Sequence, residues 1–102
     1  MVFTDGIFDV LTPTDVRLFE FAKNFGKLTV GIYVGDNLLE RNRLISSNKF
    51  VDDVYLIRGT LVQTLIDLKP QFYLRKNESR GQYSDINEVC SDLDIKMIYL
   101  TH

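Results

Sequence analysis

Short runs of β-branched and apolar residues alternate with amphipathic segments along the whole chain, and this alternation is what most limits the fold. It is typical of α/β proteins in which helices connect parallel strands and cover both faces of the sheet. The expected strands are 2–4, 27–34, 51–58, 71–74 and 95–100, and the expected helices are 12–25, 38–48, 60–68 and 84–93. The sequence therefore predicts a Rossmann-like, doubly wound parallel sheet of five strands with helices on both faces.

The ends of the expected helices carry residues that these positions favour. Thr12 can cap the first helix, Pro13 falls at its first position, and Asp15 suits the positive end of the helix dipole. Gly26 is expected to end this helix, and Thr60 to cap the third one. The apolar stripe predicted for the first helix consists of Leu18, Phe21, Ala22 and Phe25.

The length and charge of the chain limit its partners. At 102 residues, it is expected to form one domain over residues 1–102. It has 12 Lys and Arg residues against 14 Asp and Glu residues, for a formal charge of -2. Because nucleic-acid binding depends on basic groups that neutralise phosphates, no nucleic-acid partner is expected. Arg75, Lys76 and Arg80 form a candidate anion site, although a charged loop of this kind is usually solvated.

Cysteine and histidine are scarce. Cys90 is the only cysteine, so no disulfide is possible within the chain, and this residue is expected to be a small buried hydrophobe. His102 is the only histidine, and no metal site is predicted. The sequence does not begin with a basic stretch followed by an apolar run, and no apolar run approaches membrane-spanning length. We therefore expect a cytoplasmic protein with no membrane partner.

Several segments follow the pattern of a known family in order and spacing. Gly6-Ile7-Phe8-Asp9 comes after the first expected strand, like the Gly-x-Phe-Asp segment of glycerol-3-phosphate cytidylyltransferase and its relatives. Arg41 precedes Val51-Asp52-Asp53-Val54, as an arginine precedes a Val-Asp-x-Val strand in that family. Over nearly all of its length, the chain resembles a cytidylyltransferase-like nucleotidyltransferase of this type.

This resemblance implies a site and its ligands. The nucleotide-binding residues that it implies are Gly6, Ile7, Phe8, Asp9 and Arg41. The implied ligand is a nucleotide, CTP or ATP, with Mg²⁺ needed by an active enzyme and no other cofactor. The residues themselves leave plainer interpretations open. Gly6 is also typical of a turn, Phe8 of a core residue, and Arg41 of a solvated or salt-bridged side chain.

The departures from the family's pattern fall on residues that handle phosphate. Thr12-Pro13-Thr14-Asp15 stands in place of His-x-Gly-His, so Thr12 and Asp15 occupy the histidine positions and no catalytic residue is assigned. In the family, those histidines are thought to stabilise the phosphate as pyrophosphate leaves, a role that a carboxylate opposes. The segment 35–40 lacks a lysine, and Arg75-Lys76-Asn77-Glu78 replaces a Gly-Asp-Asp segment. The sequence also stops at Thr101-His102, where the family's Ser/Thr-rich motif is expected.

Three functions are compatible with these observations. The first is a catalytically degenerate family member that serves as a binding or protein-interaction module. The second is an active nucleotidyltransferase that transfers CMP or AMP to a phosphorylated small molecule. The third is a structural subunit of a larger assembly, since a fold does not fix a function.

The aromatic content favours assembly with another chain. Phe3, Phe19, Phe50 and Tyr55 are examples of aromatic residues that a small core does not obviously absorb. Members of the family often form dimers near the nucleotide site, through the first helix and neighbouring loops. We therefore expect a homodimer or a complex with another protein.

Overall fold

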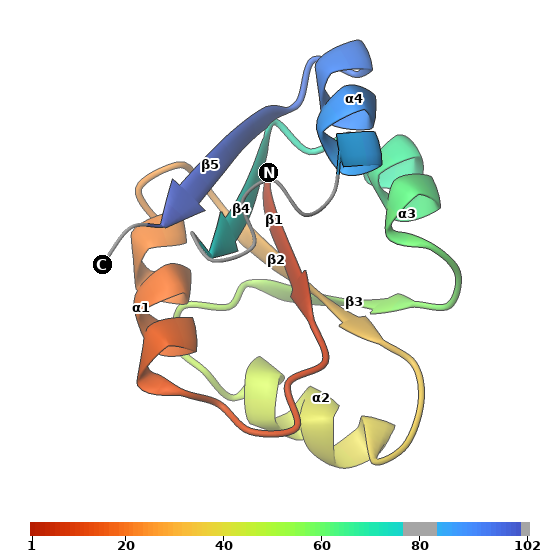
Figure 1. Ribbon diagram of the computed structural model, residues 1–102. Coiled ribbons are helices and arrows are strands. Elements are labelled where there is room, and N and C mark those ends of the chain that lie inside the picture. Colours follow the sequence, from red (N-terminus) through yellow and green to blue (C-terminus); the bar gives the residue numbers. More distant parts are fainter. Residues whose placement is uncertain (77–83, 101–102) are drawn as a thin grey trace.

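The computed structural model describes residues 1–76 and 84–100, which form one parallel sheet with helices on both of its faces (Figure 1). The strands are β1 (Val2–Gly6), β2 (Leu28–Tyr33), β3 (Asp53–Ile57), β4 (Phe72–Lys76) and β5 (Lys96–Leu100). The helices are α1 (Pro13–Ala22), α2 (Leu38–Ser46), α3 (Leu61–Leu68) and α4 (Ser84–Asp92). The strand order β3-β2-β1-β4-β5 confirms the predicted fold class and places the topological switch point between β1 and β4.

Two elements differ from their predicted limits for local reasons. The segment from Arg75 onward was expected to be a loop, but Arg75 and Lys76 belong to β4, because they pair in register with Tyr99 and Leu100 of β5. Helix α1 ends at Ala22 rather than at residue 25, because the chain tightens there into a turn. The expectations for Arg80, for capping by the Ser84 side chain and for His102 lie outside the described residues. No helix within the described residues is both long and apolar enough to cross a membrane.

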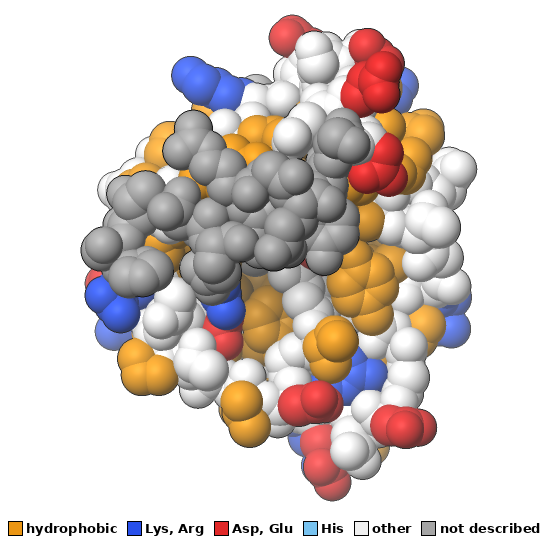
Figure 2. Space-filling model, viewed as in Figure 1, with side chains coloured by type: hydrophobic (Ala, Val, Ile, Leu, Met, Phe, Trp, Pro, Cys, Tyr) orange, Lys and Arg blue, Asp and Glu red, His pale blue; other side chains and the backbone are white. Residues whose placement is uncertain are grey.

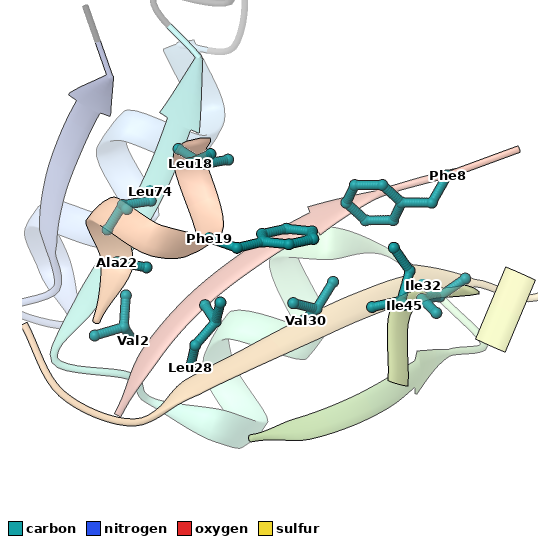
Figure 3. Close-up of a cluster of buried hydrophobic side chains, with 10 residues drawn as sticks. All are labelled: Val2, Phe8, Leu18, Phe19, Ala22, Leu28, Val30, Ile32, Ile45 and Leu74. Atoms are coloured by element: carbon teal, nitrogen blue, oxygen red, sulfur yellow. The ribbon is translucent and has the colours of Figure 1, made fainter. Parts of the chain in front are cut away.

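Two hydrophobic cores sandwich the sheet. Figure 3 shows the first core, where side chains of α1 lie against the central strands. Its buried members are Val2, Phe8, Leu18, Phe19, Ala22, Leu28, Val30, Ile32, Ile45 and Leu74. The second core, on the side of α3 and α4, is built from Phe3, Ile57, Leu65, Tyr73, Ile86, Cys90 and Ile95. Alternate residues of β1 enter opposite cores, as the period of a strand requires. Cys90 is the buried hydrophobe that its sequence context predicts.

The two cores bury aromatic residues that a small core was not expected to hold. Phe3 and Phe19 are both 0% exposed, so this expectation was wrong for them. Of the stripe predicted for the first helix, Leu18 and Ala22 are buried and Phe21 and Phe25 are half-buried against the core, while the buried Phe19 was not part of the prediction. Phe50 and Tyr55 are half-buried against the two cores. Phe3 and Phe19 therefore give no support to self-association.

Candidate functional site

A pocket of about 900 Å³ opens at the carboxyl ends of the strands, beside the switch point between β1 and β4. Ligands of open α/β sheets bind at this place. The end of β1, the residues after it, the end of β4 and the first turns of α1, α3 and α4 line the pocket. Figure 2 shows a face of the molecule on which hydrophobic, acidic and basic side chains lie close together around a hollow.

The loop after β1 forms one wall of the pocket. Gly6, Ile7, Phe8 and Asp9 all line it, as a ligand-binding role for this segment requires. Phe8 has a left-handed backbone (φ 57°), which costs a bulky residue about 1–2 kcal/mol. Its ring offsets this cost because it is buried and packs edge-on against Phe19, with the ring centroids 5.7 Å apart.

Phe8 also needs the glycine at position 6. A Cβ atom on Gly6 would lie 2.7 Å from the Phe8 ring, so any side chain there would displace this ring. Phe8 is therefore a core residue and Gly6, at the end of β1, leaves room for its ring, and both also line the pocket. Ile7 and Val10, by contrast, are 61% and 68% exposed at the mouth of the pocket.

Arg41 lies behind this loop and is only 4% exposed, so it is not a solvated side chain. Its Nη1 donates hydrogen bonds to the carbonyl oxygens of Ile7 (3.0 Å) and Tyr33 (2.7 Å). Its Nε donates to the Asp36 carbonyl oxygen (2.9 Å) and lies 4.0 Å from Asp9 Oδ1. Arg41 thus ties the segment after β1 to the segment after β2. It is not among the described residues that line the pocket, and a phosphate contact for it stays a prediction.

Thr12 and Asp15 form a capping box at the start of α1, as the sequence predicts for the cap. The Asp15 amide donates to Thr12 Oγ1, while the Thr12 amide and hydroxyl both donate to Asp15 Oδ2. Lys76 Nζ, at the end of β4, lies 2.7 Å from Asp15 Oδ1. The two positions where the family pattern has histidines therefore bond to each other and to a lysine from a different strand.

Asp15 is 4% exposed, and its charge depends on these partners. Burial raises the pKa of the Asp15 carboxyl, but the hydrogen bonds from Lys76 and Thr12 together outweigh burial and hold this pKa below its usual 3.8. A lowered pKa in the folded state means that the ionised carboxylate stabilises the fold above about pH 3.8. This contribution is lost as the pH falls through the folded-state pKa.

We therefore expect Asp15→Asn to destabilise the protein by about 1–3 kcal/mol at pH 7, because hydrogen bonds to a charged group are lost. The difference in unfolding free energy between the wild type and the variant should shrink as the pH falls below about 3.8. Urea unfolding followed by circular dichroism at a series of pH values measures this difference in unfolding free energy. Asp53→Asn is the matched control, since Asp53 is exposed at the start of β3. A difference that stays constant down to pH 2 would contradict this account of Asp15.

Asp5, near the end of β1, forms a further polar group of the site with Tyr33 and Tyr73. Tyr33 Oη donates to Asp5 Oδ2 (2.7 Å), and Tyr73 Oη donates to Asp5 Oδ1 (2.5 Å). Three neighbouring strands, β2, β1 and β4, supply these side chains. Burial and the adjacent Asp5 carboxylate raise the pKa of Tyr73 far above its usual value, so its hydroxyl keeps its proton and remains a donor. The sequence prediction missed this group, because the strand order that brings these residues together was not assigned.

The described acidic residues do not form a protein site for Mg²⁺. No group of three His, Cys, Asp or Glu residues suited to a metal ion occurs within residues 1–76 and 84–100. Asp15 is paired with Lys76, and Asp5 is held by two tyrosines.

Comparisons with known proteins identify the fold. No model of a known protein family and no curated protein sequence matches the chain. The crystal structure of the lipopolysaccharide core biosynthesis protein from Thermoplasma volcanium is similar, with a TM-score of 0.81 and 22% identity over 98% of this chain and 94% of that chain. Pantothenate synthetase from Thermus thermophilus has a TM-score of 0.71 and 12% identity, and the match covers 97% of this chain but 54% of the synthetase. At these identities the likeness shows the fold alone, and the chain shares the Rossmann-like α/β fold of these structures.

Proposed function

We propose that this protein is a catalytically degenerate relative of the glycerol-3-phosphate cytidylyltransferase type that binds a small molecule in the pocket at the switch point. The observation that carries the proposal is the linked set of Thr12, Asp15 and Lys76. It places a buried carboxylate at the start of α1 and uses the nearest lysine to neutralise it.

Nucleotidyl transfer needs the opposite arrangement. Charge develops on the phosphate oxygens as pyrophosphate leaves, so catalysis requires cations and hydrogen-bond donors directed at those oxygens. Here Asp15 adds a negative charge, and its ion pair offsets the charge of Lys76. Thr14 adds a side chain where the family pattern has a glycine. A pocket of about 900 Å³ is nevertheless present, which supports binding as the function.

The similar structures fit this proposal without deciding it. Their printed names describe a lipopolysaccharide core biosynthesis protein and a pantothenate synthetase. A shared fold supports many activities, so neither activity transfers to this chain on that ground. A protein-interaction role is the second part of the proposal. It rests on Ile7 and Val10, large apolar side chains that lie exposed on the loop beside the pocket.

Two measurements on the same sample test the proposal. The protein is incubated with CTP or ATP, Mg²⁺ and glycerol 3-phosphate, and pyrophosphate release is followed. We expect none above the protein-free rate. Release that depends on Mg²⁺ and disappears in Lys76→Met would show that the protein is an active enzyme.

Binding is measured by ¹H–¹⁵N correlation spectra with CTP, ATP and their monophosphates. A ligand of the pocket should shift the amide signals of Ile7, Asp9 and Arg75, which line it, and leave Lys96 at the opposite end of the sheet unchanged. Light scattering of the sample reports whether the chain associates with itself, and Ile7→Ser should weaken any association through the exposed loop.

A further inference from the structure

We propose that the ligand of this pocket is a small organic cation whose ammonium group binds the Asp5 carboxylate. This inference rests on the proposed binding function and names its ligand class. The geometry that points to it is a carboxylate at the end of the central strand, lining the pocket, with neutral hydroxyl groups as its hydrogen-bond partners.

The hydrogen bonds of Asp5 hold it in place without neutralising it. Tyr33 and Tyr73 each donate to a different carboxylate oxygen, which fixes the plane of the carboxylate. A carboxylate has about four acceptor positions, so each oxygen of Asp5 has one left. Within the described part of the chain, no Lys or Arg nitrogen lies within 4.0 Å of Asp5. Since a partly buried charge is costly unless it is paired, a cationic ligand group is its natural complement.

Some of the other charges around the pocket are paired within the protein. Its described lining residues include four carboxylates and two cationic side chains, namely Asp5, Asp9, Asp15, Asp85, Arg75 and Lys76. Lys76 is paired with Asp15, and Asp9 lies near Arg41. Arg75 lies over the Tyr73 ring, with its guanidinium carbon 5.4 Å from the ring centroid. This cation weakens the negative potential near Asp5 but does not form an ion pair with it.

Helix N-termini favour anions, and the first turns of three helices line this pocket. Each is equivalent to about half a positive charge. Asp85 lies in the first turn of α4, and its full negative charge more than offsets that terminus. Asp15 lies in the first turn of α1, but its charge is already matched by Lys76, so α1 and α3 keep their positive ends. At α3, the Thr60 hydroxyl accepts from the Gln63 amide.

The remaining lining suits an apolar body attached to the ammonium group. Ile7, Val10, Leu61 and Val62 add apolar side chains to the lining. A volume of about 900 Å³ is within the range of small-molecule sites. The ligand class is therefore an amine with a hydrocarbon portion.

The test uses four probes of one chain length, namely n-hexylammonium, 1-hexanol, hexanoate and 6-aminohexanoate. Each is titrated into ¹⁵N-labelled protein at pH 7, and affinities come from the shifts of the amides that line the pocket. We expect hexylammonium to bind most tightly, hexanol weakly and hexanoate least. The zwitterion 6-aminohexanoate shows whether Arg75 contributes, and it should bind no better than hexylammonium.

Variants distinguish the effect of the Asp5 charge on hexylammonium binding from the effect of the protein's net charge. Asp5→Asn should weaken hexylammonium binding about tenfold or more, because it removes a charge-assisted hydrogen bond. Asp53→Asn removes the same charge from the exposed start of β3 and should leave the affinity unchanged. Tyr33→Phe, which keeps the carboxylate but frees one of its oxygens, should retain selectivity for the ammonium probe. It serves as the second variant if Asp5→Asn does not fold, as judged by circular dichroism.

A wrong ligand class and a wrong proposed function would give different results. Equal binding of hexanol and hexylammonium, tighter binding of hexanoate, or equal effects of Asp5→Asn and Asp53→Asn would overturn the ligand class. In those cases, shifts at the pocket amides would still support a binding function. Absence of any shift with all four probes would overturn the ligand class as well. Pyrophosphate release in the enzyme assay would overturn the proposed function independently of these titrations.

Discussion

Arg41→Met should lower the free energy of unfolding by about 3–5 kcal/mol, a large part of the roughly 5–15 kcal/mol that stabilises an ordinary domain. Arg41 is 4% exposed, and its guanidinium group donates to the carbonyl oxygens of Ile7, Tyr33 and Asp36. Methionine fills a similar volume but leaves these acceptors without a donor. Because the carbonyls belong to segments that follow two different strands, the loss should also loosen the pocket wall.

Chemical denaturation followed by circular dichroism gives the change in unfolding free energy. Arg43→Met is the matched control, since Arg43 is exposed on the same helix and its replacement should change stability by about 0.5 kcal/mol or less. Arg41→Lys keeps the charge but cannot reproduce the planar donor geometry, so it should recover only part of the loss. Equal stability of the Arg41→Met and Arg43→Met variants would show that the carbonyl contacts contribute little.

Phe19→Ala should cost about 3–5 kcal/mol, the usual range for removing a buried aromatic ring. Phe19 is 0% exposed and lies between α1 and the sheet, where its ring meets that of Phe8 (Figure 3). The cavity left behind removes the support for Phe8, whose left-handed backbone then has less to hold it. Thermal unfolding measures the loss, and the amide signals of residues 7–10 should broaden or shift.

Leu39→Ala is the control for Phe19→Ala. Leu39 is 63% exposed on α2, so truncating it should change stability by about 0.5 kcal/mol or less. The comparison also bears on assembly. If Phe19→Ala changed the oligomeric state but not the stability of the folded chain, Phe19 would be an interface residue, and its burial in the core would not describe the protein in solution.

The fold could be predicted because its signals are local. The alternation of apolar runs and amphipathic segments specifies strands and helices, and Thr12, Pro13 and Thr60 mark helix starts within a few residues of their partners. The structure confirms the five-stranded parallel sheet and both threonine caps. Errors fell at element ends, where pairing across strands decides how far each element extends, as it does for Arg75 and Lys76.

The site was harder to predict, since its contacts connect distant parts of the chain. Asp5 meets Tyr73 across 68 residues of sequence, and Arg41 meets the Ile7 carbonyl across 34. Such pairs follow from the order of the strands, which the alternating pattern alone does not give. The prediction did select residues 6–9, and these residues line the pocket. It did not find Asp5 or Tyr33, for which a carboxylate at the end of a central strand was the available signal.

The ion pair between Asp15 and Lys76 means that the order of mutations matters if histidines are to be introduced at positions 12 and 15. A histidine at position 15 would face the lysine, so proton uptake by its imidazole would be opposed by a like charge. Replacing Lys76 first would instead leave the buried Asp15 carboxylate without its cation, which lowers stability. Each single step toward these histidines therefore passes through an impaired variant, although the two replacements together avoid both conflicts. The replacements at positions 15 and 76 must therefore occur together before either one brings an advantage.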